Sequence, residues 1–188
     1  MKNYDGFITS NGLYKPSSTR SLVGSLPSNC YTLIQDREGN LYFKEQETNH
    51  DQLISLPDPS YETVVSEMKH FLKPETRKIF SDLGYLYKRS SLLHGLPGTG
   101  KTSIVNRVSA YLLEQNGIAL FNPTPSLLGE ALAVLKDSNP DTTVLVIFEE
   151  LDQLIGAYES ALLNILDGET QTENVIYLAT TNFINKIP

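Results

Sequence analysis

The chain contains 188 residues, which is enough for one domain of ordinary size and a small appendage. Its formal net charge of −7, from 15 basic and 22 acidic residues, argues against nucleic acid or an anionic membrane surface as a partner but does not exclude a local basic patch. The chain has a single cysteine, Cys30, and shows no signal-peptide pattern. Its apolar runs are also far shorter than the roughly 20 residues of a membrane span. We therefore expect an intracellular, cytoplasmic protein.

Residues 1–57 are predicted to form an N-terminal arm and β-hairpin region that precedes a core at residues 58–188. Residues 1–28 are rich in Ser, Asn, Gly and Thr and show no convincing period, so we expect a loop or a weakly ordered arm. Apolar and polar residues then alternate on both sides of a turn at residues 36–40, which is typical of a β-hairpin. Residues 49–59 are interpreted as a linker.

Two short helices are predicted next. Asp58 and Pro59 suit the cap and the first turn of a helix that runs to Leu72 and is stopped by Pro74. Pro74 itself opens a second helix, which Gly84 closes. The side chains expected to face inward from this second helix are Ile79, Phe80 and Leu83.

From Ser90 onward, short apolar strands alternate with helices. The strands are expected at residues 91–95, 118–121, 143–148 and 174–180, and the helices at residues 103–115, 126–136 and 159–168. This alternation predicts βαβ crossovers, and therefore an α/β fold with a parallel sheet that carries helices on both faces.

A glycine-rich segment follows the first of these strands. It matches the pattern G-x-x-x-x-G-K-[ST], the phosphate loop of P-loop NTPases. In such a loop, glycines let backbone N–H groups surround an anion, the following helix adds its positive end, and the lysine reaches the outer phosphates. The residues predicted to bind the nucleotide are Gly95, Pro97, Gly98, Thr99, Gly100, Lys101, Thr102 and Ser103. The alternative is a strand-to-helix turn that needs glycine for its geometry alone.

Two acidic residues follow the third strand. The apolar residues 144–148 predict a buried strand, so Glu149 and Glu150 fall at its carboxyl end, where open α/β sheets place their ligands. Opposite Thr102, one of them is expected to hold Mg²⁺, and the other to polarise an attacking water. The alternative is that both glutamates simply start the next helix, where negative charge is favourable.

The last predicted strand ends in Thr180, Thr181 and Asn182. If this strand lies beside the first, Asn182 comes near the terminal phosphate and helps to position water. Asparagine is also an ordinary strand terminator, so both interpretations stay open. His94, at the end of the first strand, is expected to be a packed core residue and is left out of the site.

Four segments, GLPGTGKT, FEELD, ALLNILDG and ATTN, occur in the order of Walker A, Walker B, the helix after it and sensor one of the AAA+ ATPases. This match covers residues 90–182. Within the family, the sequence is similar to the branch that contains the mitochondrial chaperone that translocates the Rieske iron–sulfur protein. The resemblance implies ATP and Mg²⁺ as cofactors, and an ATPase that works in a homo-oligomeric ring and moves a protein client. It also implies that Glu150 is the catalytic glutamate, Asn182 the sensor-one asparagine, and Lys101 and Thr102 the ligands of phosphate and Mg²⁺.

The sequence departs from the family pattern in three places. Glu149 stands where the family has an aspartate, whose side chain is one methylene shorter. Leu127-Leu128-Gly129 stands where the family's pore loop often has an aromatic residue before a glycine. No arginine follows Arg107 in the chain, although the family has an arginine finger and a helical lid after sensor one. We therefore expect either a piece of a longer protein or a degenerate module without efficient turnover.

Two other functions stay open at this level. A nucleotide-gated binding module would bind ATP, hydrolyse little and dock a partner through residues 1–57. A DNA-replication or transposition ATPase would share the same core, although the net charge of −7 counts against it.

Overall fold

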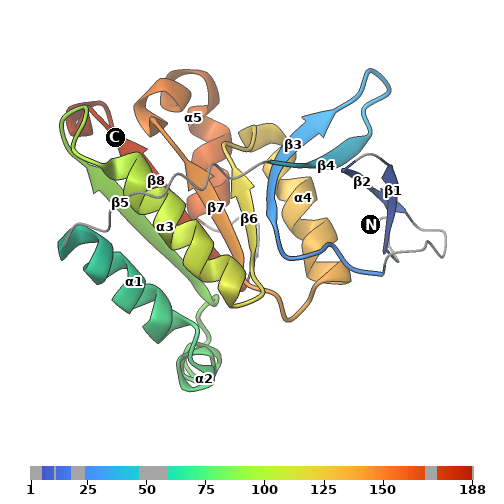
Figure 1. The fold of residues 1–188 in the computed structure, drawn as a ribbon, viewed down its shortest axis with the longest axis horizontal. Helices are drawn as coiled ribbons and strands as arrows, with labels where there is room; N and C mark the ends of the chain where they lie inside the picture. Colours follow the sequence, from blue (N-terminus) through green and yellow to red (C-terminus); the bar gives the residue numbers. More distant parts are fainter. Residues whose placement is uncertain (1–5, 11, 18–23, 47–58, 168–172, 188) are drawn as a thin grey trace.

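The computed structural model describes residues 6–10, 12–17, 24–46, 59–167 and 173–187 (Figure 1). Within these ranges the strands form an eight-stranded sheet in the order β1-β2-β4-β3-β6-β7-β8-β5. The strands are β1 (Gly6–Ser10), β2 (Leu13–Ser17), β3 (Cys30–Gln35), β4 (Leu41–Glu45), β5 (Lys88–His94), β6 (Ile118–Phe121), β7 (Val144–Phe148) and β8 (Val175–Thr181). The helices are α1 (Pro59–Phe71), α2 (Pro74–Asp82), α3 (Lys101–Glu114), α4 (Pro125–Ser138), α5 (Leu151–Asp167) and the 3-10 turn η1 (Ile184–Lys186). The predicted cap Asp58 and most of the predicted linker lie outside the described residues.

Strands β6, β7, β8 and β5 are parallel to one another, and their connections are the helices α3, α4 and α5. Helices α1 and α3 cover one face of this sheet, and α4 and α5 cover the other (Figure 1). Strand β7 shows why its sequence is wholly apolar: Val144, Val146 and Phe148 pack on the α4 and α5 side, while Leu145 and Ile147 pack on the α1 and α3 side. The predicted α/β fold is confirmed, and β8 lies beside β5, which is the condition under which Asn182 was expected to come near the terminal phosphate.

The N-terminal strands extend this parallel sheet. The expectation of a loop or a weakly ordered arm is wrong for residues 6–10 and 13–17, because β1 and β2 form an antiparallel pair and β2 also pairs with β4. The interior of this pair is anchored by Phe7, which is fully buried against Phe43. The hairpin of β3 and β4 is present as predicted, and β3 continues in parallel onto β6 through Cys30 and Tyr31. The division of the chain into an N-terminal region at residues 1–57 and a core at residues 58–188 stays a prediction.

The turn of the predicted hairpin is held by one side chain. The Asp36 carboxylate accepts hydrogen bonds from the side chain and the backbone N–H of Asn40, and from the backbone N–H of Glu38. These hydrogen bonds, with those from Asn40 foremost, lower the pKa of Asp36 to about 2. The Asp36 carboxylate therefore stabilises the five-residue loop, residues 36–40, and with it the pairing of Gln35 with Leu41.

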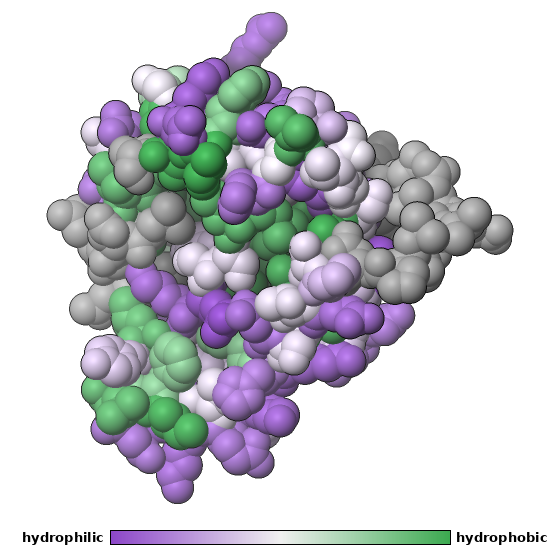
Figure 2. All heavy atoms as spheres, turned by 90° about the vertical axis from the view of Figure 1, so that its left-hand side faces the viewer, coloured by the Kyte–Doolittle hydropathy of each residue, from purple (hydrophilic) through white to green (hydrophobic). Residues whose placement is uncertain are grey.

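Two expectations about the helices need correction. Ile79 and Leu83 of the α2 segment were expected to face inward, but they are 54% and 63% exposed. Of the three predicted side chains only Phe80 packs inward, in T-shaped contacts with the rings of Phe71 and Tyr87. Figure 2 shows hydrophobic side chains gathered at the lower left of that view, at the level of α2. The third core helix begins at Leu151 and not at residue 159, with a kink at Tyr158.

None of the described helices is both long enough and apolar enough to cross a membrane.

Phe43→Ala is expected to lower the free energy of unfolding by about 3–5 kcal/mol, because the buried Phe43 ring contacts those of Phe7 and Tyr31. Urea unfolding followed by circular dichroism measures this. Ile8→Ala is the matched control, since Ile8 lies on strand β1 but is 53% exposed, and its effect should stay within about 0.5 kcal/mol. Phe7, Tyr31 and Phe43 belong to the same buried cluster as residues of β6, β7 and α4. If Phe43→Ala melted the N-terminal strands alone and left the main transition unchanged, this shared core would be contradicted.

Candidate functional site

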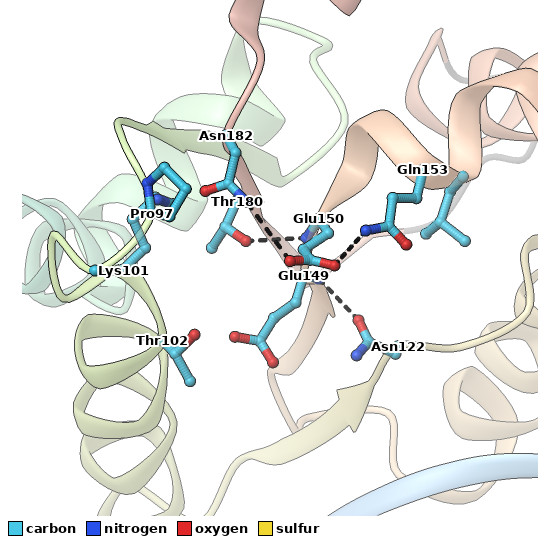
Figure 3. Close-up of a pocket in the computed structure, with 11 residues that line it drawn as sticks. Pro97, Lys101, Thr102, Asn122, Glu149, Glu150, Gln153, Thr180 and Asn182 are labelled. Atoms are coloured by element: carbon cyan, nitrogen blue, oxygen red, sulfur yellow. Dashed lines mark hydrogen bonds between the residues drawn. The ribbon is translucent and has the colours of Figure 1, made fainter.

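A cavity of about 540 Å³ lies at the carboxyl ends of the parallel strands (Figure 3). Its walls come from the loop after β5 and the start of α3, from the ends of β6, β7 and β8, and from the first turn of α5. The lining residues are Pro97, Gly98, Lys101, Thr102, Asn122, Glu149, Glu150, Gln153, Leu154, Thr180 and Asn182. The structure therefore brings together the three groups of residues that the sequence marked separately: the phosphate loop, the acidic pair and the strand-end asparagine.

The glycines of the phosphate loop are required by backbone conformation. Gly98 and Gly100 have φ angles of +79° and +85°, a left-handed region that side chains other than glycine rarely adopt. An added Cβ at either position would meet no atom within 4 Å apart from the glycine and its two chain neighbours, so crowding by other residues is not the reason. Gly100 immediately precedes α3, which aims its N-terminal N–H groups and the positive end of its dipole at the cavity side of the loop.

Lys101 holds its charge inside the loop. Its Nζ donates hydrogen bonds to the carbonyl oxygens of Gly95 and Leu96, both at 2.9 Å. A second loop contact runs from the Thr99 hydroxyl to the same Leu96 carbonyl at 2.9 Å. The ammonium is thus placed within the glycine-rich turn, where an anion is the natural partner for the N–H groups and for Lys101 itself.

Four predicted loop residues lie outside the cavity lining. Gly95, Thr99, Gly100 and Ser103 are not among the wall residues, and Gly95 has instead a steric role. A Cβ on Gly95 would lie 3.1 Å from the Thr99 hydroxyl oxygen, so that position is tight. His94 is exposed, so the expectation of a packed core residue is wrong.

The backbone of the acidic pair is held by a side chain from each neighbouring strand. The Glu149 N–H donates to Oδ1 of Asn122, just after β6, at 2.8 Å. The Glu150 N–H donates to Oγ1 of Thr180, on β8, at 3.1 Å. Glu150 has a φ of 53°, which is uncommon for a residue other than glycine or asparagine. These two hydrogen bonds stabilise a strained turn that directs both carboxylates toward the cavity (Figure 3).

The carboxylate of Glu150 has a donor on each oxygen. Asn182 Nδ2 donates to Oε1 at 3.5 Å, and Gln153 Nε2 donates to Oε2. Figure 3 shows the two amides approaching the carboxylate from β8 and from α5. Asn182 therefore lies beside the acidic pair, while its expected place near the terminal phosphate stays a prediction.

The donor set of the cavity fits Mg²⁺. The Thr102 hydroxyl and the Glu149 carboxylate lie across the cavity from each other (Figure 3). Magnesium is usually bound in this way, by one or two protein oxygens together with substrate phosphates and water. No group of three or more His, Cys, Asp or Glu side chains gathers as a metal cage in the part of the chain that the structure describes. The roles of Thr102 and Glu149 as metal ligands stay a prediction.

Sequence reasoning missed two polar residues of the site, Asn122 and Gln153, and the contact that a third one makes. Asn122 directly follows an apolar strand, which is the same position that marked Glu149, and its φ of 41° is one that asparagine tolerates. Gln153 lies three positions after Glu150, on the same side of a helical turn. Thr180 was noted at the end of its strand, but its hydrogen bond to the acidic pair depends on strand order.

Gly100→Ala is expected to lower the free energy of unfolding by about 1–2 kcal/mol, because the left-handed backbone brings a Cβ too close to the carbonyl oxygen. Gly156→Ala on α5 is the matched control: it has open space and no positive φ, so alanine should raise stability by roughly 0.5–1 kcal/mol. Urea unfolding of both variants is the measurement. Equal losses would show that the left-handed conformation is not what requires glycine.

Comparisons with known proteins agree with this arrangement. The family model described as "ATPase family associated with various cellular activities (AAA)" matches residues 91–188, more than half of the chain. The mitochondrial chaperone BCS1 of Bos taurus is 32% identical over 144 residues, which cover 67% of this chain and 33% of that protein. The mitochondrial chaperone BCS1 of Homo sapiens is 30% identical over 142 residues, covering 66% and 33%. The ATPase family gene 2 protein of Saccharomyces cerevisiae is 28% identical over 181 residues, covering 80% and 23%.

The chain thus spans about a third or less of the length of these relatives. The region matched by the family model contains the phosphate loop, the acidic pair and Asn182, so it contains the whole cavity. The similarity to BCS1 also agrees with the resemblance that the motifs suggested. The chain belongs to the AAA family of ATPases.

Proposed function

We propose that this chain binds ATP with Mg²⁺ in the cavity and hydrolyses the terminal phosphate. The observation that carries the proposal is the convergence of the phosphate loop, both glutamates and Asn182 on one cavity of about 540 Å³. That volume lies within the usual range of small-ligand sites, roughly 300–1,000 Å³. These residues follow three different parallel strands, β5, β7 and β8, so their meeting depends on the fold and not on closeness in sequence.

Nucleotide binding is assigned to the loop and to the start of α3. The N–H groups around Gly98 and Gly100 and the positive end of α3 face the phosphates, and Lys101 exchanges its carbonyl partners for phosphate oxygens. Thr102 and Glu149 would hold Mg²⁺, which when bound neutralises charge on the β- and γ-phosphate oxygens. The side chain of Glu149 is one methylene longer than that of the aspartate in the family pattern, so its carboxylate reaches further into the cavity than an aspartate would.

Hydrolysis is assigned to Glu150 and Asn182. In this step the oxygen of a water forms a bond to the terminal phosphorus, the bond from that phosphorus to the ADP oxygen breaks, and the water proton passes to the Glu150 carboxylate. Asn182 contacts Glu150 from β8 and is placed to orient the reacting groups. Gln153 keeps the second oxygen of Glu150 fixed from α5.

For the whole protein we propose remodelling or translocation of a protein client, driven by a homo-oligomeric ring. The support is the membership of the AAA family and the similarity to relatives named as mitochondrial chaperones. A protein client also suits the net charge of −7 better than nucleic acid does. The cytoplasmic location stays a prediction.

A second candidate function is a nucleotide-gated binding module that hydrolyses little. It is favoured by Glu149, which replaces the aspartate of the family pattern, and by the Glu150 carboxylate, whose two oxygens already have amide donors. Native mass spectrometry with ATP distinguishes the two. A monomer that keeps unhydrolysed ATP at every protein concentration supports the module, and ADP in an oligomer supports the ATPase.

Glu150→Gln is expected to lower the ATP turnover rate by a factor of about 10²–10⁴, because the amide cannot accept the water proton. ATP affinity should persist, since the phosphate loop is untouched. Phosphate release and titration with a fluorescent ATP analogue measure the two quantities. Glu159→Gln is the matched control, because Glu159 is an exposed glutamate of α5 outside the cavity. Unchanged turnover in Glu150→Gln would overturn the role of Glu150.

A further inference from the structure

Thr181, the last residue of β8, connects three parts of the site although it does not line the cavity. It is a polar residue with no exposed surface. Its carbonyl oxygen accepts a hydrogen bond from the N–H of Gly95, the first residue of the phosphate loop, at 3.3 Å. Its hydroxyl donates to Oδ1 of Asp152 at 2.6 Å and accepts from the N–H of Phe183 at 3.0 Å. Gly95 belongs to the phosphate loop, Asp152 lies two residues after Glu150, and Phe183 directly follows Asn182.

Asp152 stands in the first turn of α5, two residues after Glu150. Its carboxylate accepts the Thr181 hydroxyl and also the backbone N–H of Asn182, and these hydrogen bonds, that of Thr181 foremost, lower its pKa. The positive charge of Lys186 acts in the same direction. Asp152 is therefore an ionised acceptor at neutral pH, and a hydroxyl-to-carboxylate hydrogen bond of 2.6 Å is of the strong, charge-assisted kind.

The contacts of Asp152 and Thr181 enclose Asn182 from both sides. Thr181 precedes Asn182 and is fixed through its hydroxyl, while Phe183 follows it and is fixed through its N–H. The side chain of Asn182 reaches Glu150 at 3.5 Å, which is the outer limit of a hydrogen bond. A small displacement of the β8 end would therefore break that contact, and the backbone around Asn182 is what prevents it.

We infer that Asp152 and Thr181 act as a positioning pair, which holds Asn182 in place relative to Glu150 and to the phosphate loop. The inference rests on the proposed function and deepens it, because it says what aligns the water-handling groups with the phosphate-binding loop. Neither residue lines the cavity, so the pair acts through Asn182 and not on the nucleotide. Two residues of the segment after β7 thus have different places: Glu150 lines the cavity, and Asp152 contacts the end of β8.

Thr181→Val tests the pair, because valine keeps the shape of threonine and removes the hydroxyl. We expect single-turnover ATP hydrolysis by the full chain to fall by about tenfold or more, since small misplacements of catalytic groups carry costs of up to about 10² in rate. The dissociation constant for ATP should change less than about twofold, because the loop is intact. Thr181→Ser, which restores the hydroxyl, should recover most of the lost rate.

Thr63→Val is the matched control for this substitution. Thr63 is exposed on α1 and its hydroxyl contacts only a carbonyl of its own helix in the described structure, so both rate and affinity should be unchanged. If Thr181→Val does not fold, as judged by circular dichroism, Asp152→Ala tests the same link from its partly exposed end. A rate in Thr181→Val or Asp152→Ala equal to that of the unmodified chain would overturn the inference.

A purely structural role is separated from positioning by a double-mutant cycle. If the pair works through Asn182, then Asp152→Ala lowers the rate in the unmodified chain but causes no further loss in an Asn182→Ala background. Losses that multiply in the double variant would overturn the inference, because they would mean that the two residues act independently.

The failure of the inference and that of the proposed function look different. Wild-type rates in both Glu150→Gln and Asn182→Ala, or no hydrolysis at all by the unmodified chain, would contradict the proposed function and the inference with it. Reduced rates in Glu150→Gln and Asn182→Ala, together with a wild-type rate in Thr181→Val, would overturn the positioning pair alone.

Discussion

The parallel pairing of β6, β7, β8 and β5 is the constraint on which the site depends. The paired residues His94 and Thr181, and Phe148 and Ala179, bring the strand ends to one edge of the sheet. The residues that follow them, Gly95 and Glu149, start the two segments that carry the predicted chemistry. Side chains alternate between the faces of a strand, so a slip of one residue between β7 and β8 would turn Thr180 away from the acidic turn and separate Asn182 from Glu150.

The N-terminal strands protect one flank of this pairing. Strand β6 carries Asn122 at its end and would be an edge strand without β3, which pairs with it through Cys30 and Tyr31. Each residue of β6 is buried in the complete sheet. The β3 strand therefore supports the site indirectly, because a strand with open backbone groups on one side frays more easily than one with neighbours on both sides.

The core and the phosphate loop could be predicted from the sequence because their signals are local: apolar runs, helical periods and a fixed spacing of glycines and Lys101. Strands β1 and β2 could not, since they are short, polar, and become strands through pairing with β4. The inward face of α2 was misjudged at Ile79 because periodicity does not say which side has a partner. Asn122 and Thr180 needed the strand order before their contacts with the acidic turn became visible.

The left-handed backbone of Glu150 sets the stability of the fold against the proposed role of its side chain. A glutamate in this conformation lowers the stability of the fold by roughly 1–2 kcal/mol relative to a glycine, and only its side chain gives a reason to keep it. A laboratory selection for heat resistance alone would therefore favour glycine or asparagine at position 150. Such a selection would drive the chain toward a more stable molecule without its proposed base, so thermal robustness and turnover are opposed at this single position.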